Sequence, residues 1–205
     1  MLEKLRGPFR PLSNQIARYF TWLHPNTISI VGFILGFIPV YLYLKGFPRY
    51  AGVALLVYLF DFLDGAVAKF TGKASLFGEV LDATLDRIID ALIIFALAKG
   101  GFINSYLAVI TGLGFFLVSY VRARTGEAAA DKKIRLDIGL AQRGERVIIL
   151  MLASVFYVEE VSIPIIDIYT NSLQIVLTIL ALFAWETVIF RLVYAYKIFE
   201  RLEYE

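Results

Sequence analysis

The sequence predicts an all-α, polytopic membrane protein. Of its 205 residues, 59% are hydrophobic, whereas a soluble domain has about half of its residues apolar. The apolar residues also gather in runs close to the ~20 that a helix needs to cross a bilayer. We therefore expect one membrane domain over residues 1–205, with six transmembrane helices and an interfacial helix before them.

The interfacial helix is expected over residues 3–22. Apolar side chains recur there at helical spacing and are interleaved with Arg6, Arg10 and Arg18. The segment has no long apolar core, so we expect no cleavable signal peptide. The pattern favours a helix that lies in the membrane interface over an ordinary basic leader.

Six apolar segments follow, and each is expected to span the membrane. They cover residues 28–44, 50–70, 76–98, 102–121, 147–158 and 173–194. Turn-forming residues separate the first four segments, at Gly46–Pro48, Thr71–Lys73 and Gly100–Gly101. The short second turn makes segments 50–70 and 76–98 antiparallel neighbours.

Basic residues predict the orientation of these spans. The connection between the fourth and fifth spans carries Arg122, Arg124, Lys132, Lys133, Arg135, Arg143 and Arg146. The opposite side carries only Lys45, Arg49 and Lys99. Because positively charged loops stay in the cytoplasm, both termini are expected there, in a cell membrane.

Aspartates occur where an apolar helix should have none. The second and third segments contain Asp61, Asp64, Asp82, Asp86 and Asp90. A charge in a spanning helix costs at least ~2.5–3.5 kcal/mol on insertion scales. Asp61 and Asp64 are three positions apart, and Asp82 and Asp86 four, so each pair shares a helix face. Both pairs lie on the order of 10–15 Å below the cytoplasmic end.

Four carboxylates at one depth would repel one another unless cations held them. Two oxygen-ligated divalent cations are a recurrent device in phosphoryl transfer. The alternatives are a proton path or buried Asp–Arg pairs, although Arg87 could neutralise only one carboxylate. We therefore expect a divalent-metal site at Asp61, Asp64, Asp82 and Asp86, with Mg²⁺ as the metal and Mn²⁺ as a substitute. Asp90 shares the face with Asp82 and is expected to pair with a cation instead.

Two stretches resemble the signature of the CDP-alcohol phosphotransferase family. They are DFLDGAVAK at residues 61–69 and GEVLDATLD at residues 78–86, with eight residues between them. The family signature is D-x-x-D-G-x-x-A-R, eight residues, then G-x-x-x-D-x-x-x-D. Lys69 departs from it, since it keeps the charge of the family's arginine but loses the bidentate fork. The resemblance covers most of the chain, including Pro25-Asn26.

The resemblance implies a six-helix domain, usually a homodimer, that opens to the cytoplasm. An acceptor hydroxyl would attack the β-phosphorus of the donor and CMP would leave, with Asp86 as general base. The four aspartates would hold two metal ions. The nucleotide-binding set would be Asn26, Asp64, Gly65, Ala68, Lys69, Ser75, Gly78 and Asp82.

The acceptor is expected to be inositol 1-phosphate. Residues 81–90 and 139–146 resemble the branch of the family formed by phosphatidylinositol phosphate and archaetidylinositol phosphate synthases. A phosphorylated acceptor needs cations, and the candidates are Lys132, Lys133, Arg143, Arg146 and Arg191. Arg146 and Arg191 are the first choices for its phosphate. The alternatives are positive-inside topology for the loop residues, and snorkelling or an ion pair with Glu186 for Arg191.

The donor is expected to be a CDP-linked lipid, because the site opens beside hydrocarbon and an interfacial helix borders it. Asparagine, glutamine and methionine are scarce, which hints at a thermophilic source. An archaeal source would favour CDP-archaeol over CDP-diacylglycerol. Alternatives within the family are a CDP-inositol donor, or glycerol 3-phosphate or inositol as acceptor.

We expect no nucleic-acid partner. Three other classes of protein remain as alternatives to the phosphotransferase. An intramembrane prenyltransferase would need a second aspartate motif, which is not found. A cation-coupled transporter would place its acidic residues near the bilayer midplane rather than toward the cytoplasm. A catalytically inactive scaffold would have no need of four intact aspartates.

Overall fold

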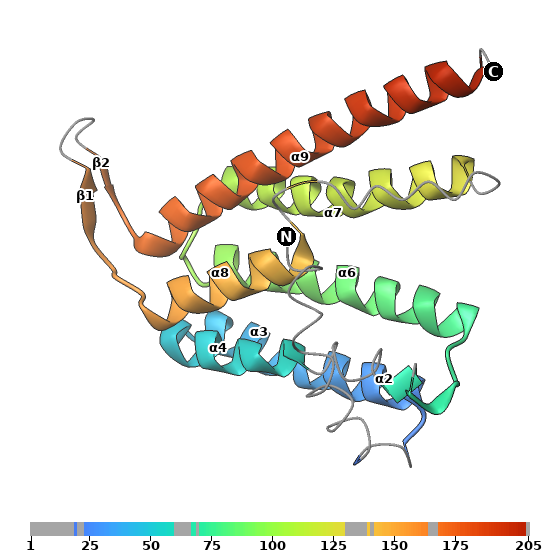
Figure 1. The fold of residues 1–205 in the computed structure, drawn as a ribbon. Coiled ribbons are helices and arrows are strands. Elements are labelled where there is room, and N and C mark those ends of the chain that lie inside the picture. The colour runs from blue at the N-terminus through green and yellow to red at the C-terminus, as the bar shows by residue number, and fades with distance from the viewer. Residues whose placement is uncertain are drawn as a thin grey trace. The chain divides into compact units, whose positions relative to one another are not determined.

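The structure, a computed structural model, describes residues 19, 23–59, 67–68, 70–129, 139, 142–163 and 168–203. These ranges are almost entirely helical, as predicted (Figure 1). The chain divides into two compact units. The first combines Met1–Gly101 with Met151–Tyr157, and the second combines Phe102–Leu150 with Val158–Glu205.

The elements whose bounds lie in the described part of the first unit are helices and one 3₁₀ segment. They are α2 (Pro25–Leu35), α3 (Phe37–Leu44), α4 (Pro48–Ala54), η1 (Leu55–Leu59) and α6 (Leu76–Lys99). The predicted breaks are confirmed, and Gly46, Gly72 and Gly101 adopt positive φ in them, a conformation that glycine reaches without strain. Helix α3 follows α2 directly, because Gly36 between them keeps a helical φ of −60°.

Helices α2 and α3 pack against α6 in this unit. Gly36 makes the close approach possible, since a Cβ built on it would lie 2.9 Å from Ile89 Cγ1. Helix α4 meets the last turn of α8 (Arg143–Val155), where a Cβ on Gly52 would lie 2.7 Å from the Val155 backbone nitrogen. Beside this contact, the buried hydroxyls of Tyr43 and Ser154 share a 2.5 Å hydrogen bond.

The second unit contains α7 (Ser105–Ala128), the first part of α8 and α9 (Ser172–Glu203). Helices α7 and α9 lie side by side (Figure 1). Gly114 on α7 faces Ala184 on α9, and a Cβ added there would lie 3.2 Å from the Ala184 Cβ. The Trp185 indole also donates a 3.1 Å hydrogen bond to the Ile110 carbonyl.

A short β-hairpin accompanies the helices, and the fold remains mostly helical. Strands β1 (Val161–Ile163) and β2 (Ile168–Thr170) are antiparallel, with Val161 opposite Thr170. Both strands are rich in β-branched residues, which fit a pleated strand. Each strand has only three residues, too few for the pattern to stand out from an ordinary loop.

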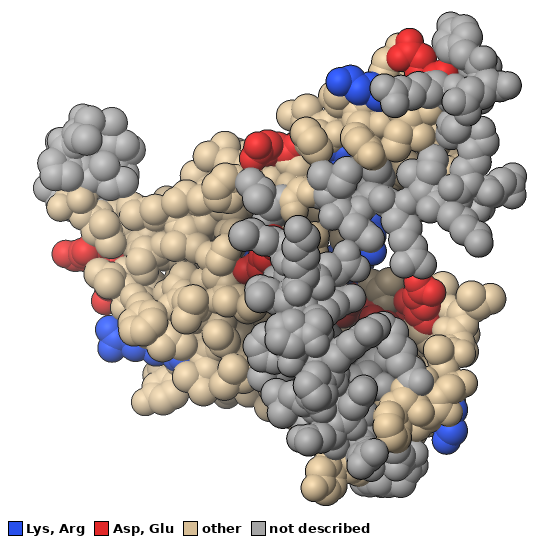
Figure 2. Space-filling model, in the orientation of Figure 1, with Lys and Arg blue, Asp and Glu red and all other residues tan. Residues whose placement is uncertain are grey.

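Within the described residues, three helices are long and apolar enough to cross a membrane. They cover Pro25–Leu44, Ser105–Ala128 and Ser172–Glu200. Many large apolar side chains are exposed on them, and uncharged residues make up most of the described surface in view (Figure 2). A lipid environment accounts for such a surface. The predicted interfacial helix and the centre of the predicted second span lie outside the described residues.

Candidate functional site

Helix α6 presents the aspartates that the sequence singled out in its third segment. Asp82, Asp86 and Asp90 follow one another at four-residue spacing, so they occupy neighbouring positions on successive turns. The Asp86 and Asp90 side chains are only 14% and 15% exposed. A carboxylate with so little water contact requires compensating cations or hydrogen bonds.

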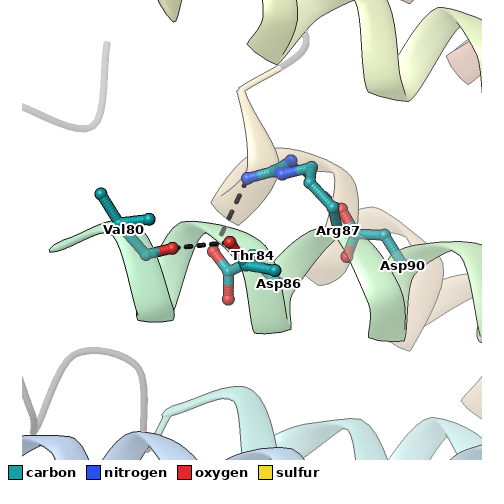
Figure 3. Close-up of polar contacts among 5 residues, drawn as sticks. All are labelled: Val80, Thr84, Asp86, Arg87 and Asp90. Atoms are coloured by element: carbon teal, nitrogen blue, oxygen red, sulfur yellow. Dashed lines mark hydrogen bonds and ion pairs between the residues drawn. The ribbon is translucent and has the colours of Figure 1, made fainter. Parts of the chain in front are cut away.

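Arg87 supplies one such cation (Figure 3). Its Nη2 lies 3.6 Å from Asp86 Oδ2, and its Nη1 lies 3.5 Å from Asp90 Oδ2. The expectation that Asp90 pairs with a cation is therefore confirmed. Thr84, which lies between Asp82 and Asp86, donates its hydroxyl to the Val80 carbonyl at 2.7 Å. That hydroxyl is committed to the helix backbone.

Asp82 and Asp86 fit a divalent cation by the chemistry of their donors. Carboxylate oxygens are the ligands that Mg²⁺ and Mn²⁺ prefer, and the i, i+4 spacing lets both side chains turn to one side of α6. Their predicted partners Asp61 and Asp64 lie outside the described residues, as do Gly65 and Lys69. Among the described residues alone, no three acidic, histidine or cysteine side chains form a metal-binding group.

The first turn of α6 brings three of the predicted nucleotide-binding residues together. Ser75 caps the helix, and its Oγ accepts a 3.0 Å hydrogen bond from the Gly78 nitrogen. A Cβ built on Gly78 would lie 2.8 Å from Asn26 Oδ1 and 3.0 Å from Ser75 Oγ. The absence of a side chain at Gly78 therefore lets the Asn26 and Ser75 side chains approach the start of α6 closely, where backbone N–H groups favour an anion.

Local capping places Asn26 at this contact. His24 is the N-cap of α2 and its Nδ1 accepts a hydrogen bond from the Asn26 nitrogen at 3.3 Å, with Pro25 in the first helical position. The α2 helix therefore starts at the level of the α6 start. Ala68, the remaining described member of the predicted set, is half-buried in a helical segment before the turn at Gly72.

In the second unit, Arg146 and Arg191 converge on α7. Both are buried, with exposures of 3% and 2%. The Arg146 guanidinium carbon lies 4.1 Å from the centroid of the Phe115 ring, a cation–π contact. Arg191 donates a hydrogen bond from Nη1 to the Val118 carbonyl. Phe115 and Val118 are three positions apart, so the two arginines meet α7 within one turn.

Burial of Arg191 argues against the alternative that its side chain snorkels to water. A snorkelling side chain would carry its charge to water, whereas Arg191 is enclosed and bonded to α7. Arg143 begins α8 and is half-buried. Lys132 and Lys133 lie outside the described residues.

Sequence reasoning missed the residues that hold these arginines. Nothing in the sequence marks Phe115 or Val118 as anything but membrane-span residues. Gly139 could have been noticed from the sequence, because it is the first residue of the stretch 139–146 that resembles a branch of the family. It has φ +124°, and any side chain there would collide with Thr187, one turn before Arg191 on α9. Only glycine fits that contact.

Comparisons with known proteins agree with the motifs. Residues 22–193 match the CDP-alcohol phosphatidyltransferase family. The chain is similar to archaetidylinositol phosphate synthase of Pyrococcus horikoshii, with 36% identity over 206 residues and 99% coverage of each chain. It is also 35% identical to phosphatidylinositol phosphate synthase of Mycobacteroides abscessus, over 71% of this chain and 67% of that protein.

Solved structures show the same fold. Phosphatidylinositol phosphate synthase of Mycobacterium tuberculosis with CDP-DAG bound gives a TM-score of 0.74 at 26% identity, covering 91% of this chain and 94% of that one. The complex of that protein with manganese and citrate gives a TM-score of 0.73 at 27% identity, covering 90% of this chain and 88% of that one.

Proposed function

The chain belongs to the CDP-alcohol phosphatidyltransferase family, and on that premise we propose that it transfers a lipid phosphate from a CDP-linked lipid to inositol 1-phosphate. CMP is the other product. The observation that carries the proposal is the order of groups along α6. The polar contact of Asn26 and Ser75 with Gly78 comes first, and Asp82 and Asp86 follow on the next two turns.

This order matches the order of groups in the donor. The cytidine end would lie at the start of α6, against Asn26, Ser75 and Gly78. The rest of the nucleotide set would come from Asp64, Gly65, Ala68 and Lys69, with Asp82 on the α6 side. The diphosphate would then extend along α6 toward Asp86.

The chemistry requires one bond to form and one to break. The acceptor hydroxyl oxygen bonds to the β-phosphorus of the donor, the bond from that phosphorus to the bridging oxygen breaks, and CMP leaves. Asp86 takes the hydroxyl proton as general base. Divalent metal, Mg²⁺ or Mn²⁺ in two sites on Asp61, Asp64, Asp82 and Asp86, would neutralise the diphosphate.

The acceptor phosphate would be held by Arg146 and Arg191. Two buried guanidinium groups on one turn of α7 form an unusually concentrated positive site for a membrane domain. Guanidinium forks match phosphate geometry bidentately. Lys132, Lys133 and Arg143, from the same cytoplasmic connection, would add to the attraction. Glycerol, serine and inositol have no net charge and no phosphate to place between the two guanidinium groups.

CDP-archaeol is the proposed lipid donor. The archaeal relative named archaetidylinositol phosphate synthase aligns over 99% of both chains, which is more than the bacterial phosphatidylinositol phosphate synthase does. CDP-diacylglycerol is the alternative, because the matching structure from M. tuberculosis holds CDP-DAG.

The proposed architecture is one domain over residues 1–205 with six membrane spans, an interfacial helix at residues 3–22 and both termini in the cytoplasm. The excess of lysine and arginine in the loops on one side supports the orientation. A homodimer is proposed from the family resemblance.

The experiment that tests the function is CMP release by the purified chain with Mg²⁺. CDP-archaeol and CDP-diacylglycerol are each offered with inositol 1-phosphate, inositol, glycerol 3-phosphate or serine. We expect release only with inositol 1-phosphate, and the faster donor names the lipid. Release with another acceptor would keep the metal mechanism and refute the assignment of Arg146 and Arg191. No release with any acceptor would refute the transferase function.

A further inference from the structure

Arg87 is shared between two carboxylates rather than committed to one. Its two terminal nitrogens lie 3.6 Å from Asp86 and 3.5 Å from Asp90. Both distances exceed the 2.7–3.2 Å range of a well-formed N–H···O hydrogen bond. Figure 3 shows the guanidinium on the side of α6 between the two aspartates. The pairing is therefore electrostatic and divided nearly equally.

The charge beside Asp86 matters because the Asp86 carboxylate can pair either with the Arg87 guanidinium or with a divalent cation. A guanidinium that settled on Asp86 would neutralise the carboxylate and compete with a divalent cation for it. The Arg87 guanidinium lies 3.6 Å from Asp86, near enough to do so. Asp90 offers Arg87 a second carboxylate one turn further along α6. The formal charges of Asp86, Arg87 and Asp90 sum to −1, which favours the approach of a further cation.

We propose that Asp90 is a positioning residue for the reaction, because it holds the Arg87 guanidinium back from Asp86. Asp86 then remains accessible to the divalent cation and to the acceptor hydroxyl. The inference rests on the proposed function, since it gives a role to two charged residues beside the proposed metal ligands. It predicts that Asp90 controls metal affinity through Arg87, without touching the metal.

A purely structural ion pair makes a different prediction. An i, i+3 pair on a helix contributes a few tenths of a kcal/mol to stability, and its loss would lower the melting temperature without changing metal affinity. The chain contains a matched example, since Arg124 and Glu127 on α7 form an exposed i, i+3 pair at 2.6 Å.

The test is a double-mutant cycle read by binding of Mn²⁺ alone to the full chain in detergent, with free Mn²⁺ followed by electron paramagnetic resonance. We expect Asp90→Asn to weaken Mn²⁺ binding by about threefold to tenfold, as for one partly buried charge contact. Arg87→Gln should tighten binding by a similar factor. Adding Asp90→Asn to Arg87→Gln should have little further effect, and Glu127→Gln should have none.

Three results would overturn the proposal. Asp90→Asn weakening Mn²⁺ binding equally with and without Arg87 would mean that Asp90 acts on the metal directly. An unchanged Mn²⁺ affinity in Arg87→Gln would mean that Arg87 does not compete, even if the Asp90→Asn variant failed to fold. Absence of Mn²⁺ binding by the wild-type chain, or its persistence in Asp86→Asn, would refute the proposed metal site itself and not only the role of Asp90.

Discussion

Asp86 on α6 combines a shielded position, a contact with Arg87 and the proposed roles in metal binding and proton transfer. It is largely shielded from water, lies one turn after Asp82 and has Arg87 as its direct neighbour. A shielded carboxylate is costly unless cations approach it, and both the Arg87 guanidinium and a divalent cation are suited to do so. The same carboxylate oxygens are the groups that would bind metal and accept a proton.

Replacing Asp86 by asparagine should abolish most of the activity. Asparagine has nearly the same shape but cannot accept the acceptor proton or offer a charged ligand. We expect CMP release at saturating donor and Mg²⁺ to fall by about 10²–10⁴-fold, the range for loss of a general base. The exposed Glu127→Gln variant is the control and should retain full activity. Full activity in Asp86→Asn would remove the general-base assignment.

Gly78 is the second residue at which a small change should have a specific effect. In Gly78→Ala, the added methyl group would fall 2.8 Å from Asn26 Oδ1 and displace Asn26 and Ser75 from the start of α6. We expect the KM for the CDP-lipid to rise by about tenfold or more while the KM for inositol 1-phosphate stays the same. Measured initial rates against each substrate separate the two.

Gly126→Ala is the matched control for that variant. Gly126 also lies in a helix, but a Cβ there meets nothing within 4 Å. Alanine favours a helix over glycine by about 0.5–1 kcal/mol, so the control should be neutral or slightly more stable. Equal kinetic effects of both alanines would mean that the polar groups around Gly78 do not bind donor.

At the level of elements, α7 serves as the surface on which two distant arginines meet. Arg146 comes from the first turns of α8 and Arg191 from the second half of α9, and both reach the same turn of α7. The close helix contact at Gly114 and Trp185 fixes the α9 side of this arrangement. The packing of three elements, and not any one loop, thus forms the positive site.

Arg146→Lys and Arg191→Lys should each weaken acceptor binding. Lysine keeps the charge but loses the fork, and it loses the stacking on Phe115 in the case of Arg146. We expect the KM for inositol 1-phosphate to rise by about 10–100-fold, the equivalent of one charge-assisted hydrogen bond. The donor KM should not change. The control is the exposed Arg124→Lys, and a parallel rise in the donor KM would point to a general loss of packing.

At the level of the whole molecule, the charge distribution predicts which ends of the helices face the cytoplasm. The turn before α6 and the segment after α8 fall on opposite sides of the membrane in the proposed topology. Both contain exposed residues, Lys73 and Glu160. The chain has no cysteine, so a single introduced cysteine reports its own position without background.

Single-cysteine variants therefore test the topology directly. In intact cells, a membrane-impermeant maleimide should label Glu160→Cys, while Lys73→Cys should react only after permeabilisation. Retained CMP release by each variant checks that it is folded. The opposite labelling pattern would reverse the proposed orientation, and labelling of both in intact cells would contradict the odd number of spans between them.

The sequence by itself determined the features that depend on neighbouring residues. Helical periodicity and turn glycines predicted α2 with α3, α6 and α9 to within a few residues, except that α9 continues past Tyr194. Helix α7 likewise ends at Ala128 rather than Val121, because hydropathy marks the membrane-embedded part of a helix and not its end. The spacing of Asp82 and Asp86 fixed their common face without any tertiary information.

Only the tertiary structure decided which distant residues meet. It placed Asn26 against Gly78, and Arg146 and Arg191 on one turn of α7. It also revealed Arg87 divided between Asp86 and Asp90. Spacing along a helix is set by backbone geometry, which every helix shares. Contacts between helices and the choice of side-chain partner depend instead on how particular surfaces pack, and that is a property of the folded chain.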